Sequence, residues 1–130
     1  VIILGYPAAG LTYDYPTITE GIVSKVFVGE GDGIFLTSAT VNPGNSGGPV
    51  INLKGDLIGV IFAATNLSEV AKATGVIETA MGFGVSSNKI QEVFNYKQTV
   101  PVKKTNFNKS SLYEKMLPHV VNVATYRNEN

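Results

Sequence analysis

The sequence contains no cysteine and no tryptophan, and only one histidine, among its 130 residues. Without cysteine the fold cannot depend on disulfides, and no thiolate metal site can form. Lys plus Arg and Asp plus Glu both total 10, so the formal net charge is zero. A chain with no basic excess is poorly suited to neutralise phosphates, which argues against nucleic acid as a partner. No metal or other cofactor is predicted.

Long apolar runs are missing as well. The runs Val1 to Leu11 and Leu57 to Ala64 are shorter than the roughly 20 apolar residues that span a bilayer, so they predict buried strands and no transmembrane segment. Hydrophobic residues still make up 44% of the chain, which is typical of a globular protein. The sequence begins at Val1 inside an apolar run, which we interpret as a truncated start.

The pattern of β-branched residues and turn residues predicts an all-β unit of about six antiparallel strands. The expected strands are 1–4, 17–28, 34–40, 49–53, 57–64 and 79–85. Glycine-rich turns at 29–33 and 54–56 should join two hairpins, and 41–48 should be a loop. Residues 65–78 should be irregular, with one helical turn near 68–72.

Helical patterns follow the expected strands. Ser86 or Ser87 can cap a helix over 88–96, which should close the β unit. The residues 97–110 have the composition of a linker. Ser111 and Glu114 stand at capping-box spacing for a short helix over 111–117, and 120–126 resembles a last strand. These features divide the chain into three predicted parts, which are 1–96, the linker 97–110 and the start of a further module at 111–130.

The segment 42–50, Asn-Pro-Gly-Asn-Ser-Gly-Gly-Pro-Val, has the residues that nucleophilic catalysis by a serine requires. A serine hydroxyl needs a base to take its proton and donors to hold the oxyanion. With Gly44 two residues before Ser46, the N–H groups of both residues can serve as such donors. One alternative is a glycine-rich turn with no chemistry. Another is the nucleophile elbow of α/β-hydrolases, but a strand-like segment follows Ser46 where that elbow requires a helix.

The same segment resembles the active-site motif of trypsin-like (chymotrypsin-fold) serine proteases, in the bacterial HtrA/Deg-type branch. Three further segments are similar to that family in the same order: Thr-Glu-Gly-Ile-Val-Ser at 19–24, Gly-Asp-Leu-Ile-Gly-Val at 55–60 and Met-Gly-Phe-Gly-Val-Ser-Ser-Asn at 81–88. The resemblance covers about 1–96. It implies an antiparallel β-barrel, the C-terminal half of a two-barrel fold, with a closing helix.

The resemblance also implies roles for individual residues. Ser46 would be the nucleophile, and the N–H groups of Gly44 and Ser46 would form the oxyanion hole. The substrate-binding residues implied by the same resemblance are Phe62, Ala63, Ala64, Thr40 and Gly82. No carboxylate occupies the base of the implied specificity pocket, which favours a small or aliphatic side chain over Arg or Lys. Core packing is an equally weighted interpretation of Phe62.

The family's catalytic His and Asp belong to a first barrel that would precede Val1. His119 has no family match as a base, and we expect it to lie at the surface or at the edge of a strand. Asp14, Asp32 and Asp56 stand in turn-like contexts. The expected function is therefore that of a serine endopeptidase that acts on polypeptides, present as a fragment that is inactive alone.

The alternative is a pseudoprotease that binds peptides without cleaving them. The resemblance favours a periplasmic or extracytoplasmic location. It also implies that the missing N-terminal barrel of the same protein is a partner. The segment 111–123 is similar to the opening segment of the same family, and an ordinary helix followed by a strand explains it equally well.

Overall fold

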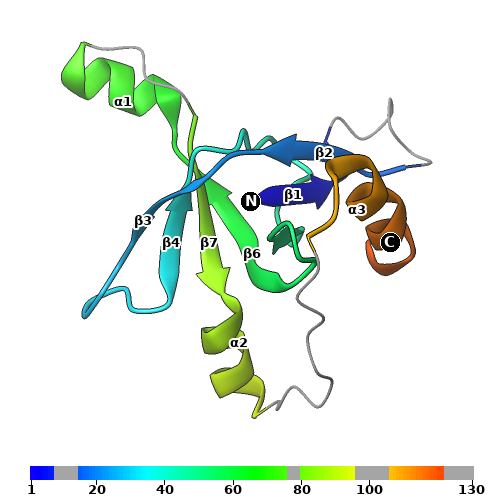
Figure 1. Ribbon diagram of the computed structural model, residues 1–130. Helices are drawn as coiled ribbons and strands as arrows, with labels where there is room; N and C mark the ends of the chain where they lie inside the picture. Colours follow the sequence, from blue (N-terminus) through cyan, green and yellow to red (C-terminus); the bar gives the residue numbers. More distant parts are fainter. Residues whose placement is uncertain (8–14, 76–79, 96–105, 122–130) are drawn as a thin grey trace, which may run out of the picture.

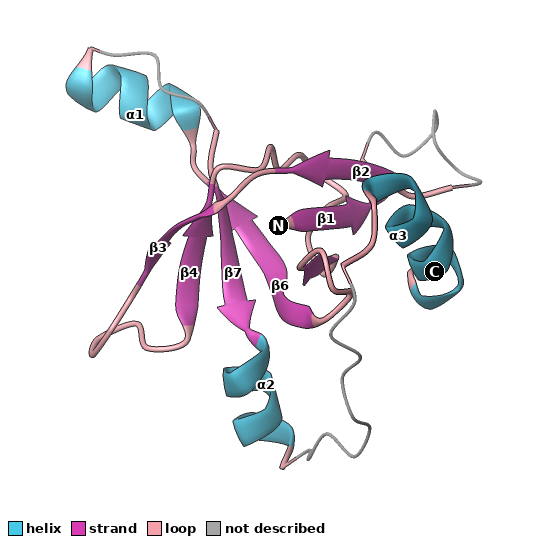
Figure 2. Ribbon diagram, in the orientation of Figure 1, coloured by secondary structure: helices cyan, strands magenta, loops and turns pink. Residues whose placement is uncertain are grey.

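A computed structural model of the chain describes residues 1–7, 15–75, 80–95 and 106–121 (Figure 1). Strands dominate the first part of the chain, and short helices stand at the periphery (Figure 2). The strands are β1 Ile2–Gly5, β2 Thr17–Glu20, β3 Val23–Val26, β4 Ile34–Thr37, β5 Pro49–Ile51, β6 Leu57–Ala64 and β7 Gly82–Ser86. The helices are α1 Leu67–Thr74, α2 Ser87–Phe94 and α3 Lys109–Met116, followed by the 3₁₀ turn η1 Leu117–His119.

The seven strands described form one antiparallel sheet in the order β2-β1-β5-β6-β7-β4-β3. Its two outermost strands, β2 and β3, are separated in the sequence only by Gly21 and Ile22. The chain therefore connects the two ends of the sheet and curls it into a barrel-like shape. This architecture confirms the predicted all-β class with its antiparallel barrel.

The strand predicted over 17–28 is two strands, because the chain changes partner at Gly21. The N–H of Gly21 donates to the Val1 carbonyl at 3.0 Å, whereas the carbonyl of Ile22 accepts from the Ser38 N–H at 3.1 Å. A side chain at Gly21 would place its Cβ 2.3 Å from the backbone nitrogen of Ala39. Glycine thus allows the close crossing at which the chain leaves β1 and joins β4.

The two predicted hairpins are present. Strands β3 and β4 pair antiparallel across the turn at 29–33, whose three glycines all have positive φ. Strands β5 and β6 pair across 52–56. In that turn the side-chain oxygen of Asn52 accepts from the N–H groups of Lys54 and Asp56, at 2.8 and 3.0 Å.

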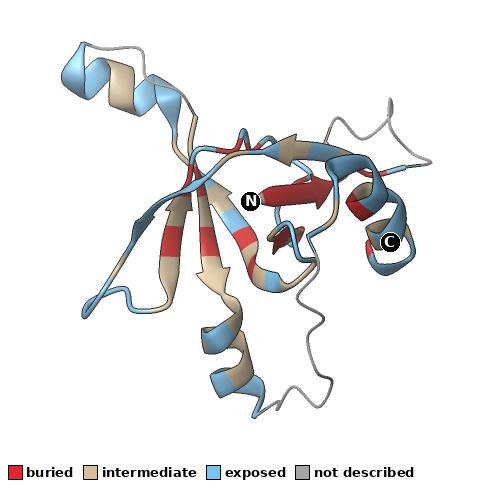
Figure 3. Cartoon of the chain, viewed as in Figure 1, coloured by how far each residue is buried: buried red, intermediate tan, exposed pale blue. Residues whose placement is uncertain are grey.

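The core has two parts, and β1 lies between them. Inside the curled sheet, Ile3 packs with residues from β4, β5, β6 and the segment that follows β4, which are Phe35, Ala39, Val41, Val50 and Ile61. On the outer face of the sheet, Ile2, Leu4 and Ile51 pack against Leu112 and Val120. All of β1 is therefore buried (Figure 3), which explains why its sequence is a continuous apolar run.

The helices differ from the sequence expectations in two respects. Helix α1 spans eight residues rather than one turn, buries none of them and projects from the sheet (Figure 1). The capping-box prediction at Ser111 was wrong, because α3 begins at Lys109 and its cap is Asn108, whose side-chain oxygen accepts from the Ser111 N–H at 2.8 Å. The predicted Ser86 cap of α2 is confirmed.

The C-terminal segment lies partly outside the described residues. Most of the predicted linker and of the predicted strand over 120–126 falls there, and the described Val120 and Val121 are not in a strand. No helix in the described ranges has the length and hydrophobicity that a membrane crossing requires.

Candidate active site

The loop before β5 is shaped by two successive hydrogen-bonded turns. The N–H of Asn45 donates to the Asn42 carbonyl at 3.0 Å, and the N–H of Gly48 donates to the Asn45 carbonyl at 2.9 Å. Gly44 has a φ of 101° and Gly47 a φ of 85°, a region that residues with a side chain rarely adopt. Ser46 lies between these two glycines.

Backbone hydrogen bonds fix this loop to the residue after β1 and to the middle of β6. The N–H of Tyr6, just after β1, donates to the Gly44 carbonyl at 3.1 Å. On the other side, the Gly47 N–H donates to the carbonyl of Ile61 in β6 at 2.7 Å, and the Ile61 N–H donates to the Gly48 carbonyl at 3.0 Å. The loop is therefore held by β1 and β6 at once.

Glycine is required at two positions because other backbone comes very close. A Cβ at Gly44 would lie 2.2 Å from the Tyr6 carbonyl oxygen, and one at Gly48 would lie 2.2 Å from the Leu4 carbonyl oxygen. By contrast, a Cβ at Gly47 would meet nothing within 4 Å. Lack of space therefore requires glycine at positions 44 and 48, but not at position 47.

Ser46 itself is exposed, and its neighbour Asn45 is buried. Within the described residues, the N–H groups of Gly44 and Ser46 donate to no acceptor. Both side-chain polar atoms of the buried Asn45 also lack a partner there. The loop thus combines an accessible hydroxyl with two uncommitted amide donors.

A pocket of about 490 Å³ opens beside Ser46. It is lined by residues that follow β1, by the serine loop and by the end of the described C-terminal segment: Gly5, Tyr6, Gly44, Ser46, Gly47, Gly48, Pro49, His119, Val120 and Val121. The positions of Tyr6 and of residues 119–121 at this pocket were not predicted from the sequence. No local signal could have revealed them, because only the tertiary fold brings the two segments together.

The predicted substrate-binding residues lie near this loop but do not line that pocket. Phe62 is half exposed and directly follows Ile61, the residue that pairs with the serine loop. Ala64 pairs with Gly82 across β6 and β7. A Cβ at Gly82 would lie 2.4 Å from Val41, the residue after the exposed Thr40.

The remaining candidate groups are distributed as follows. His119 is exposed at the end of η1 and lines the pocket of Ser46. Asp32 and Asp56 lie in the two hairpin turns, away from that pocket, and Asp14 lies outside the described residues. In the described ranges, no three His, Asp or Glu side chains form a group that could hold a metal ion.

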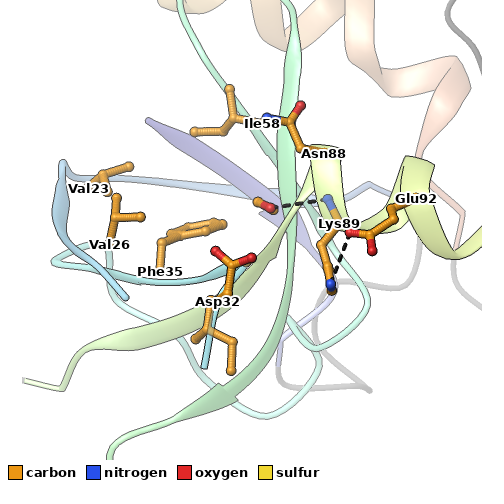
Figure 4. Close-up of a pocket in the computed structure, with 11 residues that line it drawn as sticks. Val23, Val26, Asp32, Phe35, Ile58, Asn88, Lys89 and Glu92 are labelled. Carbon is orange, nitrogen blue, oxygen red and sulfur yellow. Dashed lines mark hydrogen bonds and ion pairs between the residues drawn. The ribbon is translucent and has the colours of Figure 1, made fainter. Parts of the chain in front are cut away.

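A second pocket, of about 450 Å³, lies where β3, β4 and α2 approach one another (Figure 4). Apolar side chains such as Val23, Phe35 and Ile58 form one part of its lining. At its rim, Lys89 forms an exposed ion pair with Glu92 at 2.9 Å. The hydrogen bond that the Lys89 ammonium donates to the Glu92 carboxylate, together with the negative charge of Glu92, raises the pKa of Lys89. None of the predicted site residues lines this second pocket.

Comparison with known proteins shows which protein family this chain resembles. Residues 1–60 match the family described as trypsin-like peptidase domain. The matched region contains the serine loop and five of the described strands. It therefore covers Ser46 and its loop, but not the pocket-lining residues 119–121.

Individual relatives give a finer placement. "Protease Do-like 2, chloroplastic" from Arabidopsis thaliana is 39% identical over 88 residues, which are 62% of this chain and 14% of that protein. "Serine protease HtrA-like" from Staphylococcus aureus is 33% identical over 106 residues, 72% of this chain and 12% of that protein. The chain is thus related to trypsin-like serine protease domains of the HtrA type, as its motifs predict, and it spans a small fraction of these relatives.

A solved structure also matches. It is an inactive serine-to-alanine mutant of Rv3671c from M. tuberculosis H37Rv, with 25% sequence identity and a TM-score of 0.46. The match covers 78% of this chain and 49% of that one.

Proposed function

We propose that this chain is the serine-bearing part of an endopeptidase that cleaves polypeptides through an acyl-enzyme. Ser46 is the nucleophile, and the N–H groups of Gly44 and Ser46 stabilise the oxyanion. The observation that carries this proposal is the serine loop itself, in which Ser46 is exposed and the N–H groups of Gly44 and Ser46 have no acceptor among the described residues. The names of its relatives support it, since one is named a protease and another a serine protease.

Substrate binding is proposed to extend from this loop along the end of β6. Phe62, Ala63 and Ala64 would pair with the substrate backbone, and Thr40 and Gly82 would lie at the specificity pocket. The hydrogen bonds between Ile61 and the serine loop support this arrangement, because Phe62 directly follows the residue through which β6 binds that loop. With no carboxylate among these five residues, a small or aliphatic substrate side chain is favoured.

The proton acceptor is proposed to come from the N-terminal barrel of the same protein. Within the described residues, no side chain hydrogen-bonds to the Ser46 hydroxyl, and no carboxylate lines its pocket. An unactivated serine is a weak nucleophile, so the 130 residues alone should show little peptidase activity. One relative is named a probable periplasmic endoprotease, which supports an extracytoplasmic location.

The decisive experiment is labelling of the full-length protein with a fluorophosphonate probe. Labelling should be lost in the Ser46→Ala variant and retained in Ser24→Ala, a control that removes an equally exposed hydroxyl from β3. A folded full-length protein that does not label would refute the enzyme proposal. If that protein still bound peptides, the pseudoprotease alternative would replace it.

A further inference from the structure

The pocket at Ser46 has one wall that the serine loop does not provide. His119, Val120 and Val121 form this wall, although they follow Ser46 by more than 70 residues in the sequence. They end the described segment 106–121, which we call the tail segment. The attachment of the tail segment to the sheet therefore affects the access of other molecules to Ser46.

Apolar packing holds the tail segment on the outer face of the sheet. Leu112 of α3 is completely buried and Val120 is 8% exposed. Both pack against Ile2, Leu4 and Ile51 of β1 and β5. Burial of a leucine side chain contributes roughly 1.5–3 kcal/mol, so this packing is the main source of docking energy.

Specific hydrogen bonds fix the register of the tail segment. The Tyr6 hydroxyl donates to the Val120 carbonyl at 3.1 Å, and the Tyr113 hydroxyl donates to the Pro16 carbonyl at 2.7 Å. The Phe107 N–H donates to the Leu53 carbonyl at 2.8 Å. The Tyr6 bond is at the pocket itself, since Tyr6 also lines it. The wall is thus tied directly to the end of β1.

We propose that the docked tail segment limits the size of the group that can reach Ser46. The segment forms a wall and not a plug, because Ser46 stays exposed and the pocket remains open. Val120 is fixed in the core, whereas His119 and Val121 on either side of it are exposed and line the pocket. Small groups enter beside the wall, and bulky groups require the segment to detach. The consequence for substrates rests on the proposed function, but the steric claim does not.

The test uses chemical modification and needs no catalysis. Because the chain has no cysteine, Ser46→Cys introduces a single thiol. Methyl and benzyl methanethiosulfonate are both neutral, and each transfers its alkylthio group to the thiolate and releases methanesulfinate. The quantity compared is the ratio of the methyl rate to the benzyl rate. This ratio should be at least tenfold higher in the Ser46→Cys variant than in the Ser24→Cys variant, whose thiol replaces an exposed serine of β3.

Detachment of the tail segment from the sheet should then remove the difference between the methyl and benzyl rates. Adding Leu112→Ala, which lies outside the pocket, should raise the benzyl rate at least tenfold and the methyl rate less than twofold. Adding Tyr6→Phe should raise the benzyl rate about fivefold, as expected for one lost hydrogen bond. Should Leu112→Ala fail to fold by circular dichroism, Tyr6→Phe still decides the question. Benzyl rates that stay unchanged in the folded variants would overturn the proposal, and fluorophosphonate labelling at Ser46 would be unaffected by that outcome.

Discussion

Replacement of Gly44 by alanine tests the geometric core of the site. The residue has a φ of 101°, and a Cβ there would lie 2.2 Å from the Tyr6 carbonyl oxygen. Alanine in a left-handed conformation costs roughly 1–2 kcal/mol. The contact with Tyr6 must also be relieved by backbone movement, which sacrifices the 3.1 Å Tyr6–Gly44 hydrogen bond, worth about 1 kcal/mol, and adds strain. The total destabilisation should be about 2–4 kcal/mol.

Gly47→Ala is the matched control in the same loop. Its φ of 85° imposes a similar conformational cost, but a Cβ there meets nothing within 4 Å. Its destabilisation should therefore be only about 1–2 kcal/mol. The difference in unfolding free energy between the two variants therefore measures the contribution of the contact between Gly44 and Tyr6, the residue after β1.

Urea unfolding, followed by circular dichroism, measures both effects. For an m value of about 2 kcal/mol/M, the midpoint should fall by about 1–2 M in Gly44→Ala and by about 0.5–1 M in Gly47→Ala. In the full-length protein, Gly44→Ala should also lose most fluorophosphonate labelling, because the loop can no longer present its N–H groups. Equal midpoints for the two variants would show that Gly44 does not approach Tyr6 as described.

Three further outcomes follow from the packing and the caps. Asn108→Ala should lower the unfolding free energy by about 1 kcal/mol, whereas Ser111→Ala should change it by less than about 0.5 kcal/mol; the reverse order in urea melts would restore Ser111 as the cap of α3. Leu112→Ala should cost about 2–5 kcal/mol, and Val93→Ala, at a 70% exposed position, less than about 0.5 kcal/mol; similar thermal midpoints for the two would contradict the burial of α3. Glu92→Gln should lower the pKa of Lys89 measured by NMR titration, since the carboxylate raises it; an unchanged value would exclude the ion pair.

Most of the fold was predictable because its signals are local. The glycines at 29–33 and the Asn52 turn define hairpins within a few residues, and alternation of apolar residues identifies the strands around them. The single strand predicted over 17–28 failed for a non-local reason. The chain changes partner there, because Gly21 bonds to Val1 whereas the next residue, Ile22, bonds to Ser38.

The cap of α3 shows a similar limit. Ser111 and Glu114 have the right spacing, but Asn108 begins the helix one turn earlier. Leu112 must face β1 and β5 to be buried, and this packing places the start of the helix where Asn108 can cap it. The packing of Leu112, and not the local capping-box spacing of Ser111 and Glu114, therefore decided where α3 begins.

The sequence by itself predicted a loop around Ser46, because its Gly, Asn and Pro residues are turn formers that stand within nine consecutive positions. Only the tertiary structure decided what surrounds that loop. Tyr6 and residues 119–121 reach the pocket because β1 is apolar on both faces and its outer face is buried by the tail segment. A sequence pattern shows that a residue is apolar, but the partner that covers it is chosen by packing between distant parts of the chain.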